Sequence, residues 1–269
     1  TFTATIEGAF GATGGGDNSI DTTVTNLNVD TTSNAANGSQ WIDEADGLST
    51  LNLNAGSGNI TLNSGGTVTD GDGNADVRAT TFTATIDGAF GATGGGDNSI
   101  DTAVTNLNVD TTSNAASGSQ WIDEADGLSS LDLRAGSGAI VLTSGGTVLD
   151  PDTALDIQAT TFTGVILGDF GASATANDAI DTAVDNLNVD TFAANGSQWI
   201  NEMDSLVTLN LNAGTANITL TTGGAILDGD NALDIQATTF TGVIIGNFGA
   251  MGGGDKSIDT TVTNLNVDT

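Results

Sequence analysis

Short segments in which apolar and polar residues alternate recur along the chain. In one stretch they are LNVDTT from Leu107, LDLRAG from Leu131 and LDIQAT from Leu155, and the next, LNVDTF, begins at Leu187. Alternation with a period of two predicts a β-strand with one buried face. The first two steps between these segments are equal and the third is longer. All of them are too long for simple hairpins and indicate successive coils of a parallel β-helix.

A longer period contains these steps. The opening segment TFTATIEGAF begins at Thr1 and returns as TFTATIDGAF at Thr81, TFTGVILGDF at Thr161 and TFTGVIIGNF at Thr239. This period predicts repeats over residues 1–80, 81–160 and 161–238 and a partial fourth repeat over 239–269, all in one continuous solenoid. Coils stacked about 4.8 Å apart would make each repeat roughly 14 Å long. Neither end of the chain resembles a polar cap, so we expect the solenoid to continue beyond both ends.

The predicted fold class is therefore all-β: a right-handed parallel β-helix, or β-solenoid, with about three coils in each repeat. The right hand follows from the general preference of crossover connections between parallel strands. Leu, Val, Ile, Ala and Phe are expected inside the coils, with Asn, Asp and Thr outside. Glycine pairs such as Gly65 and Gly66 are expected at corners where the backbone needs a positive φ.

One segment in each repeat departs from the strand pattern. In SQWIDEADGL of the first repeat, Trp41, Ile42, Ala45 and Leu48 follow a helical spacing behind a serine cap. The spacing predicts a short helical turn, whose acidic residues are solvated and whose tryptophan packs against the core. Stacking of the tryptophan on a sugar is the less favoured alternative. The segment occupies residues 39–48, 119–128 and, as SQWINEMDSL, 197–206.

The charge of the chain restricts its partners. The chain has 34 acidic and 3 basic residues, for a formal net charge of −31. Such a chain repels nucleic acid and anionic membrane surfaces and attracts cations. No apolar run approaches the roughly 18 residues of a membrane span. The chain also lacks His and Cys, which removes most general-base and nucleophile schemes.

Aspartates cluster at one corner of each repeat. The pattern Asp-x-Asp-x-Asn-x-Asp that begins at Asp70 resembles the opening of a calcium loop, although no Glu stands at the twelfth position of an EF-hand. Later repeats keep the pattern in part, with Ala154 and Ala232 in place of the Asn. The sequence predicts structural Ca²⁺ at one or more of these corners; solvated turn residues are the alternative. The candidate metal ligands are Asp70, Asp72, Asn74, Asp76, Asp150, Asp152, Asp156, Asp228, Asp230 and Asp234.

The style of the repeats resembles that of a known group of proteins. The runs LNLNAGSGNITLNSGGTV (51–68) and LNLNAGTANITLTTGGAILDGD (209–230) are similar to the giant β-strand-repeat surface proteins of bacteria of the filamentous-haemagglutinin type. The resemblance implies a right-handed parallel β-helix, export to the cell surface, and a role in adhesion or in fibre formation.

We expect the chain to be a structural segment of an extracellular fibre or stalk that is attached to the cell surface and acts as a mechanical spacer or filament. Its expected partners are further copies of the same repeat, laterally associated chains and divalent cations. The alternative is a calcium-dependent, carbohydrate-binding adhesin. A polysaccharide lyase or hydrolase is less favoured, because the basic residue that a lyase needs is not repeated: Arg78 becomes Gln158 and Gln236. We therefore expect no enzyme activity.

Overall fold

The computed structural model describes residues 1–13, 18–33, 37–93, 98–113, 117–173, 178–230, 232–250 and 256–269. Within these ranges the chain has 18 strands and no helix. The strands are β1 (Phe2–Thr5), β2 (Ile20–Thr22), β3 (Asn26–Asp30), β4 (Gln40–Glu44), β5 (Thr50–Asn54), β6 (Asn59–Ser64), β7 (Val77–Ile86), β8 (Ile100–Asp110), β9 (Gln120–Glu124), β10 (Ser130–Arg134), β11 (Ala139–Ser144), β12 (Ile157–Ile166), β13 (Ile180–Asp190), β14 (Gln198–Glu202), β15 (Thr208–Asn212), β16 (Asn217–Thr222), β17 (Ile235–Ile244) and β18 (Thr260–Asp268).

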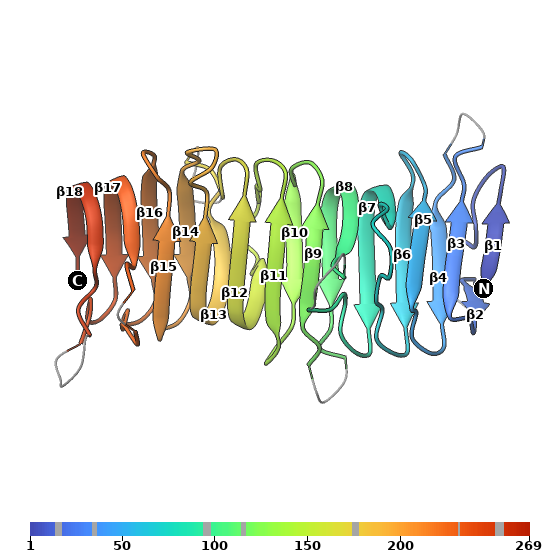
Figure 1. Ribbon diagram of the computed structural model, residues 1–269, viewed down its shortest axis with the longest axis horizontal. Helices are drawn as coiled ribbons and strands as arrows, with labels where there is room; N and C mark the ends of the chain where they lie inside the picture. Colours follow the sequence, from blue (N-terminus) through green and yellow to red (C-terminus); the bar gives the residue numbers. More distant parts are fainter. Residues whose placement is uncertain are drawn as a thin grey trace. The chain divides into compact units, whose positions relative to one another are not determined.

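The chain forms two compact units. Unit 1 comprises Thr1–Asp126 and Asp132–Ala139, and unit 2 comprises Gly127–Leu131 and Ile140–Thr269. Strands β1–β9 belong to unit 1 and β12–β18 to unit 2, and within each unit the strands lie side by side (Figure 1). Each unit is a parallel β-solenoid, and the two together hold about 11 turns. The predicted all-β stack of parallel coils is therefore confirmed, whereas its right hand stays a prediction.

The register of unit 1 shows how successive turns stack. Phe2 pairs with Leu27, and Leu27 pairs in turn with Leu51. On another face Gln40 pairs with Ile60, so stacked residues are closer in sequence there than on the face of Leu27 and Leu51. Residues one turn apart therefore stack directly, at the spacing of about 4.8 Å that parallel strands require.

In unit 2 the predicted register holds for one step and is wrong for another. Leu187 pairs with Leu209, as the shorter step of that repeat predicts. Leu187 does not stack on Leu155, the start of the preceding segment, but on Phe162. The reason is that β12 is ten residues long and crosses from one face of the coil to the next.

The corresponding strand β17 shows how this crossing works. Its beginning pairs with β15, through Leu211 and Ile235, and the rest of it pairs with β16. Traced down the stack, Ile235 lies over Leu211, Val189 and Gly164. Ile157, which is the equivalent of Ile235 in the preceding repeat, lies seven positions before Gly164. Each repeat is therefore rotated by about a third of a turn relative to the one before it.

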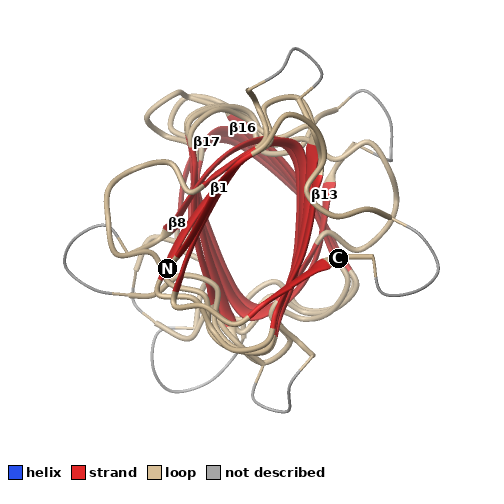
Figure 2. Ribbon diagram, turned by 90° about the vertical axis from the view of Figure 1, so that its right-hand side faces the viewer, coloured by secondary structure: helices blue, strands red, loops and turns tan. Residues whose placement is uncertain are grey.

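Apolar side chains fill the inside of each unit. In unit 2, β13, β16 and β17 border the interior, and the loops lie outside the strands (Figure 2). Phe162 and Phe170 are fully buried and their rings stack at a centroid distance of 5.7 Å. In unit 1, Phe82 and Phe90 stack at 5.9 Å. The expected division between apolar interior and polar exterior is confirmed at these positions, with exceptions that define the site described below.

The predicted helical turns are wrong. The first half of each segment that was expected to be helical forms a strand, β4, β9 or β14, and no helix follows it within these segments, all of whose residues are described. In β4 the side chains of Gln40, Ile42 and Glu44 are buried, while Trp41 and Asp43 face outward and are partly exposed. The true period is two, because the interior accepts a glutamine and a glutamate that hydrogen-bond to the backbone.

The paired glycines have a different role from the one expected. Gly65 and Gly66 do not adopt a positive φ. A Cβ atom on Gly65 would lie 2.2 Å from the carbonyl oxygen of Ala45 in the preceding turn. The pair is therefore needed for the close approach of two turns. Positive φ occurs instead at single glycines such as Gly56 and Gly214, whose φ angles are 57° and 60°.

Candidate metal centres and buried glutamates

Two groups of aspartates bring their carboxylates together in unit 2. Asp150, Asp152 and Asp156 lie in the loop between β11 and β12, and their ligand oxygens are within 4.8 Å of one another. Asp228, Asp230 and Asp234 form the same arrangement between β16 and β17. In each group the first and last aspartates are buried and the middle one is exposed. These two groups could each hold a metal ion.

Local hydrogen bonds set the shape of both loops. The Asp228 carboxylate accepts a bond of 2.9 Å from the backbone N–H of Asp230, and the Asp230 carboxylate accepts one of 2.6 Å from Ala232. Asp150 accepts in the same way from Asp152, at 3.0 Å. Such bonds from a side chain to the backbone two residues on are typical of Asx turns. The first aspartate of each group thereby positions the second.

The last aspartate of each group is tied to the following turn. The backbone N–H of Asp181 donates to Oδ2 of Asp156 at 2.6 Å. The backbone N–H of Asp259 donates to Oδ2 of Asp234, also at 2.6 Å. These bonds hold the carboxylates of Asp156 and Asp234 in a fixed orientation.

Burial controls the protonation of these groups. It raises the pKa of Asp156 to about 8 and that of Asp234 to about 6, and neighbouring carboxylates add to the rise in both cases. The Oδ2 atom of Asp228 is buried and has no hydrogen-bond partner. Buried carboxylate oxygens without a partner are costly, and a cation would satisfy them.

The donor set suits a hard cation. All candidate ligands in these two groups are carboxylate oxygens, which Ca²⁺ and Mg²⁺ prefer over softer metals. Two oxygens on opposite sides of Ca²⁺, each at about 2.4 Å, are about 4.8 Å apart. The spacing within the two groups therefore fits ligands that surround one ion.

The first repeat does not assemble the same group. Among the described residues, Asp70, Asp72 and Asp76 do not form a set with oxygens this close together. The amide of Asn74 donates to Asp72 at 2.6 Å and draws that carboxylate toward itself, whereas the later repeats have alanine at this position. Burial raises the pKa of Asp76 to about 9. The role of Asn74 as a ligand stays a prediction.

Sequence reasoning missed a second polar feature, the buried glutamates Glu44, Glu124 and Glu202. Glu124 was expected to be solvated on a helix, but it is 0% exposed. Its carboxylate accepts from the Thr102 hydroxyl at 2.6 Å and from the backbone N–H groups of Val104 at 3.2 Å and Asp126 at 3.1 Å. Reading QWIDE as a strand would have placed this glutamate inside.

The buried glutamate of unit 2 makes stability depend on pH. Burial raises the pKa of Glu202 from 4.5 to about 6, despite the hydrogen bonds that it accepts. The folded chain therefore keeps this proton to a higher pH than the unfolded chain. The stability that the proton contributes is complete below pH 4.5 and is lost as the pH rises through about 6.

We expect the free energy of unfolding of the wild-type chain to fall, relative to that of Glu202→Gln, by on the order of 1–2 kcal/mol between about pH 4 and pH 7. Urea unfolding of both chains across this range measures the difference. The glutamine variant corrects for all other titrating groups. A difference that does not change with pH would contradict the expectation.

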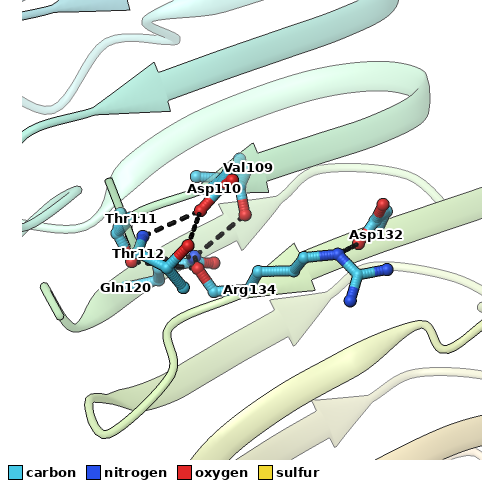
Figure 3. Close-up of polar contacts among 7 residues, drawn as sticks. All are labelled: Val109, Asp110, Thr111, Thr112, Gln120, Asp132 and Arg134. Carbon is cyan, nitrogen blue, oxygen red and sulfur yellow. Dashed lines mark hydrogen bonds and ion pairs between the residues drawn. The ribbon is translucent and has the colours of Figure 1, made fainter. Parts of the chain in front are cut away.

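Figure 3 shows the polar contacts of the buried Gln120 and of Arg134 in unit 1. The amide of Gln120 donates to the carbonyl oxygens of Val109 at 3.0 Å and Arg134 at 3.1 Å, and to the Thr111 hydroxyl at 3.2 Å. The Arg134 guanidinium forms an ion pair of 2.8 Å with Asp132 of the same strand. The backbone of Arg134 thus supports the core, while its side chain pairs along the outer face.

The fold and its aspartate groups define a β-solenoid repeat protein with candidate metal centres. No family model matches the chain, and comparison with curated proteins and with solved structures gave no match either. The structure shows the β-solenoid fold that the resemblance to filamentous-haemagglutinin-type proteins implies. Membership in that group of proteins stays a hypothesis. No helix in the described part of the chain is long and apolar enough to cross a membrane.

Proposed function

We propose that the chain is a mechanical spacer, a stiff segment of an extracellular fibre or stalk attached to the cell surface. The observation that carries this proposal is the register, in which successive turns of each unit stack residue on residue. Some equivalent residues also have the same structural role in successive repeats. Glu124 and Glu202, for example, accept bonds from equivalent threonines and backbone N–H groups. Turns that repeat one another's contacts are what a spacer requires.

Stacked turns resist bending because each one is held in several ways. Every fully buried Leu, Ile or Phe contributes about 1.5–3 kcal/mol, and these side chains lie in continuous columns. Parallel ladders of backbone hydrogen bonds join each turn of a unit to the next. Bending would have to separate several ladders and one side of the core together. Further copies of the repeat, and laterally associated chains, are the partners that fit this role.

Electron microscopy of chains that contain extra copies of residues 81–160 tests the proposal. About 11 turns in 269 residues correspond to a little over three turns per repeat. Each added copy should lengthen the particle by about 16 Å and leave its width unchanged. A Gly/Ser insert of the same length is the control and should add no rigid length. Separate beads, or a particle of unchanged length, would contradict the spacer.

We further propose that the ion held by the aspartate groups is Ca²⁺ and that its role is structural. Ca²⁺ accepts six to eight oxygens in flexible geometry, whereas Mg²⁺ demands a near-ideal octahedron and keeps several waters. Loops in which carboxylates come from alternate residues suit the first ion better. Bound Ca²⁺ would offset part of the net charge of −31 where acids are closest together.

A calcium-dependent, carbohydrate-binding adhesin is the second candidate function. It is favoured by a groove of about 350 Å³ in unit 1, whose lining includes Trp41, Asp43 and Asn63. The tryptophan is partly exposed at the outer face of β4, where the helical prediction had packed it inward. An aromatic ring beside a carboxylate and an amide is a combination that suits a sugar ring and its hydroxyl groups.

A further inference from the structure

One carboxylate oxygen in unit 2 has no partner within its own loop. Asp228 is only 4% exposed, and its Oδ1 atom accepts the backbone N–H of Asp230 at 2.9 Å. Its Oδ2 atom is buried without a hydrogen bond. The neighbouring carboxylates of Asp230 and Asp234 lie within 4.8 Å, and they cannot donate when ionised. A cation between these three carboxylates would give the buried Oδ2 atom of Asp228 a partner.

A fourth aspartate lies beside this group, on the following turn. Asp259 immediately precedes β18 and is joined to Asp234 by two hydrogen bonds. The backbone N–H of Asp234 donates to the carbonyl oxygen of Asp259 at 3.0 Å, and that of Asp259 donates to Oδ2 of Asp234 at 2.6 Å. The charge of the Asp259 carboxylate acts on Asp234. Asp259 is thus placed next to the loop by the register of β17 and β18.

The other aspartate group has the same neighbour. The backbone N–H of Asp156 donates to the carbonyl oxygen of Asp181 at 2.9 Å, and that of Asp181 donates back to Oδ2 of Asp156 at 2.6 Å. The Asp181 carboxylate interacts electrostatically with Asp150, Asp152 and Asp156. The amide of Asn201 donates to its Oδ1 atom at 2.5 Å and fixes its orientation.

We propose that Asp181 and Asp259 complete the two metal centres, so that each bound divalent cation is shared between a loop and the turn that follows it. The cation then acts as a clamp between adjacent turns. This inference rests on the proposed binding of Ca²⁺ and adds to it a ligand from outside each loop. The carboxylates of Asp181 and Asp259 are not among the oxygens that lie within 4.8 Å of one another, so each of them has to turn toward its loop when the ion binds.

The chemistry of the sites supports the shared arrangement. Three carboxylates that each supply one oxygen leave at least half of the coordination sphere of Ca²⁺ open, since the ion takes six to eight oxygens. A fourth carboxylate on the adjacent turn adds ligands and negative charge, both of which raise affinity for the ion. Without the ion, those of the four acids that are ionised repel one another. The cation therefore turns a repulsive contact between two turns into an attractive one.

Calorimetric titration of the full chain with Ca²⁺, after treatment with a chelator, tests the clamp. We expect two sites in the wild-type chain. Asp259→Asn should weaken one of them on the order of tenfold or more and leave the other unchanged, and Asp181→Asn should do the same to the second site. Asp268→Asn, at the exposed end of β18, is the matched control and should bind as the wild type does.

Hydrogen exchange of the wild-type chain gives a measurement that needs no variant. Ca²⁺ should slow exchange both in the loop that contains Asp228 and at the start of β18. If Asp181→Asn and Asp259→Asn bind Ca²⁺ like the wild type, or if exchange slows in the loops alone, the clamp is wrong although the calcium centres stand. If the wild-type chain binds no Ca²⁺, the calcium proposal fails together with the clamp, and the spacer is unaffected.

Discussion

Replacing Gly223 by alanine should destabilise unit 2 by about 3 kcal/mol or more. A Cβ atom at this position would lie 2.0 Å from the carbonyl oxygen of Met203 and 2.9 Å from its carbonyl carbon. Both atoms belong to the backbone of the preceding turn, so no side-chain movement can relieve the collision. The two turns must separate, which weakens the hydrogen bond of 2.8 Å from the Gly223 N–H to the Glu202 carbonyl oxygen. Urea unfolding measures the loss.

Gly71→Ala is the matched control for this substitution. Gly71 also has an ordinary φ, and the nearest atoms to its Cβ position, in Ser49 and Thr50, are both 3.7 Å away. The alanine fits there, so stability should change by no more than about 0.5 kcal/mol. Equal effects of the two substitutions would show that the turns are not in close contact at Gly223.

Replacing Glu124 by alanine should destabilise unit 1 by about 3 kcal/mol. The substitution removes the acceptor for the Thr102 hydroxyl and for the backbone N–H groups of Val104 and Asp126. It also leaves a cavity where a side chain was fully buried. Glu124→Gln should lose about half as much, because its amide keeps one acceptor and sets a donor against the remaining N–H groups. Thermal and urea unfolding measure both variants.

The exposed Glu7 supplies the control. Glu7→Ala removes the same side chain from a position without such buried bonds, so stability should change by no more than about 0.5 kcal/mol. If Glu124→Ala were as mild as Glu7→Ala, water or another group would have to satisfy the three donors, and the role given to the glutamate would be incorrect.

The strands could be predicted where the interior is purely apolar. In LNLN of β5, Leu51 and Leu53 are buried and the asparagines face outward, so local alternation is sufficient. The step from Leu27 to Leu51 also gives the correct pairing. Both predictions succeed because they depend on a period and on a turn length that the repeats display directly.

The predictions fail where polar residues lie inside the coil or where a strand crosses two faces. Gln40 and Glu44 are polar residues on the buried face of β4, so QWIDE lacks the alternation of apolar and polar residues that predicts a strand. Its sequence therefore resembled an amphipathic helix with Trp41 on the apolar side. Only the hydrogen bonds of the folded chain show why Gln40 and Glu44 can be inside. The long step from Leu155 to Leu187 failed because the length of β12 depends on its two neighbours in the stack and not on its own alternation.

The candidate metal centres were predicted in part. Alternate aspartates identified both groups that the structure assembles, because residues of one loop are close in sequence as well as in space. The spacing could not find Asp181 or Asp259, the further ligands that we propose, because each lies a full turn beyond its partner, Asp156 or Asp234. A contact between residues of adjacent turns depends on the number of residues in one turn. This number differs between the faces of the coil. The register between β12 and β13 and between β17 and β18 would have been enough to identify both aspartates.

The ten-residue strands that pass from one face to the next determine what a partner can reach. Because equivalent residues of successive repeats in unit 2 are offset by seven positions, any group that occurs once in a repeat is displayed along a spiral and not along a single stripe. A flat surface that meets unit 2 from one side would therefore not encounter the same group in both of two successive repeats. Tight multivalent attachment to unit 2 would then require a binding partner that winds around it.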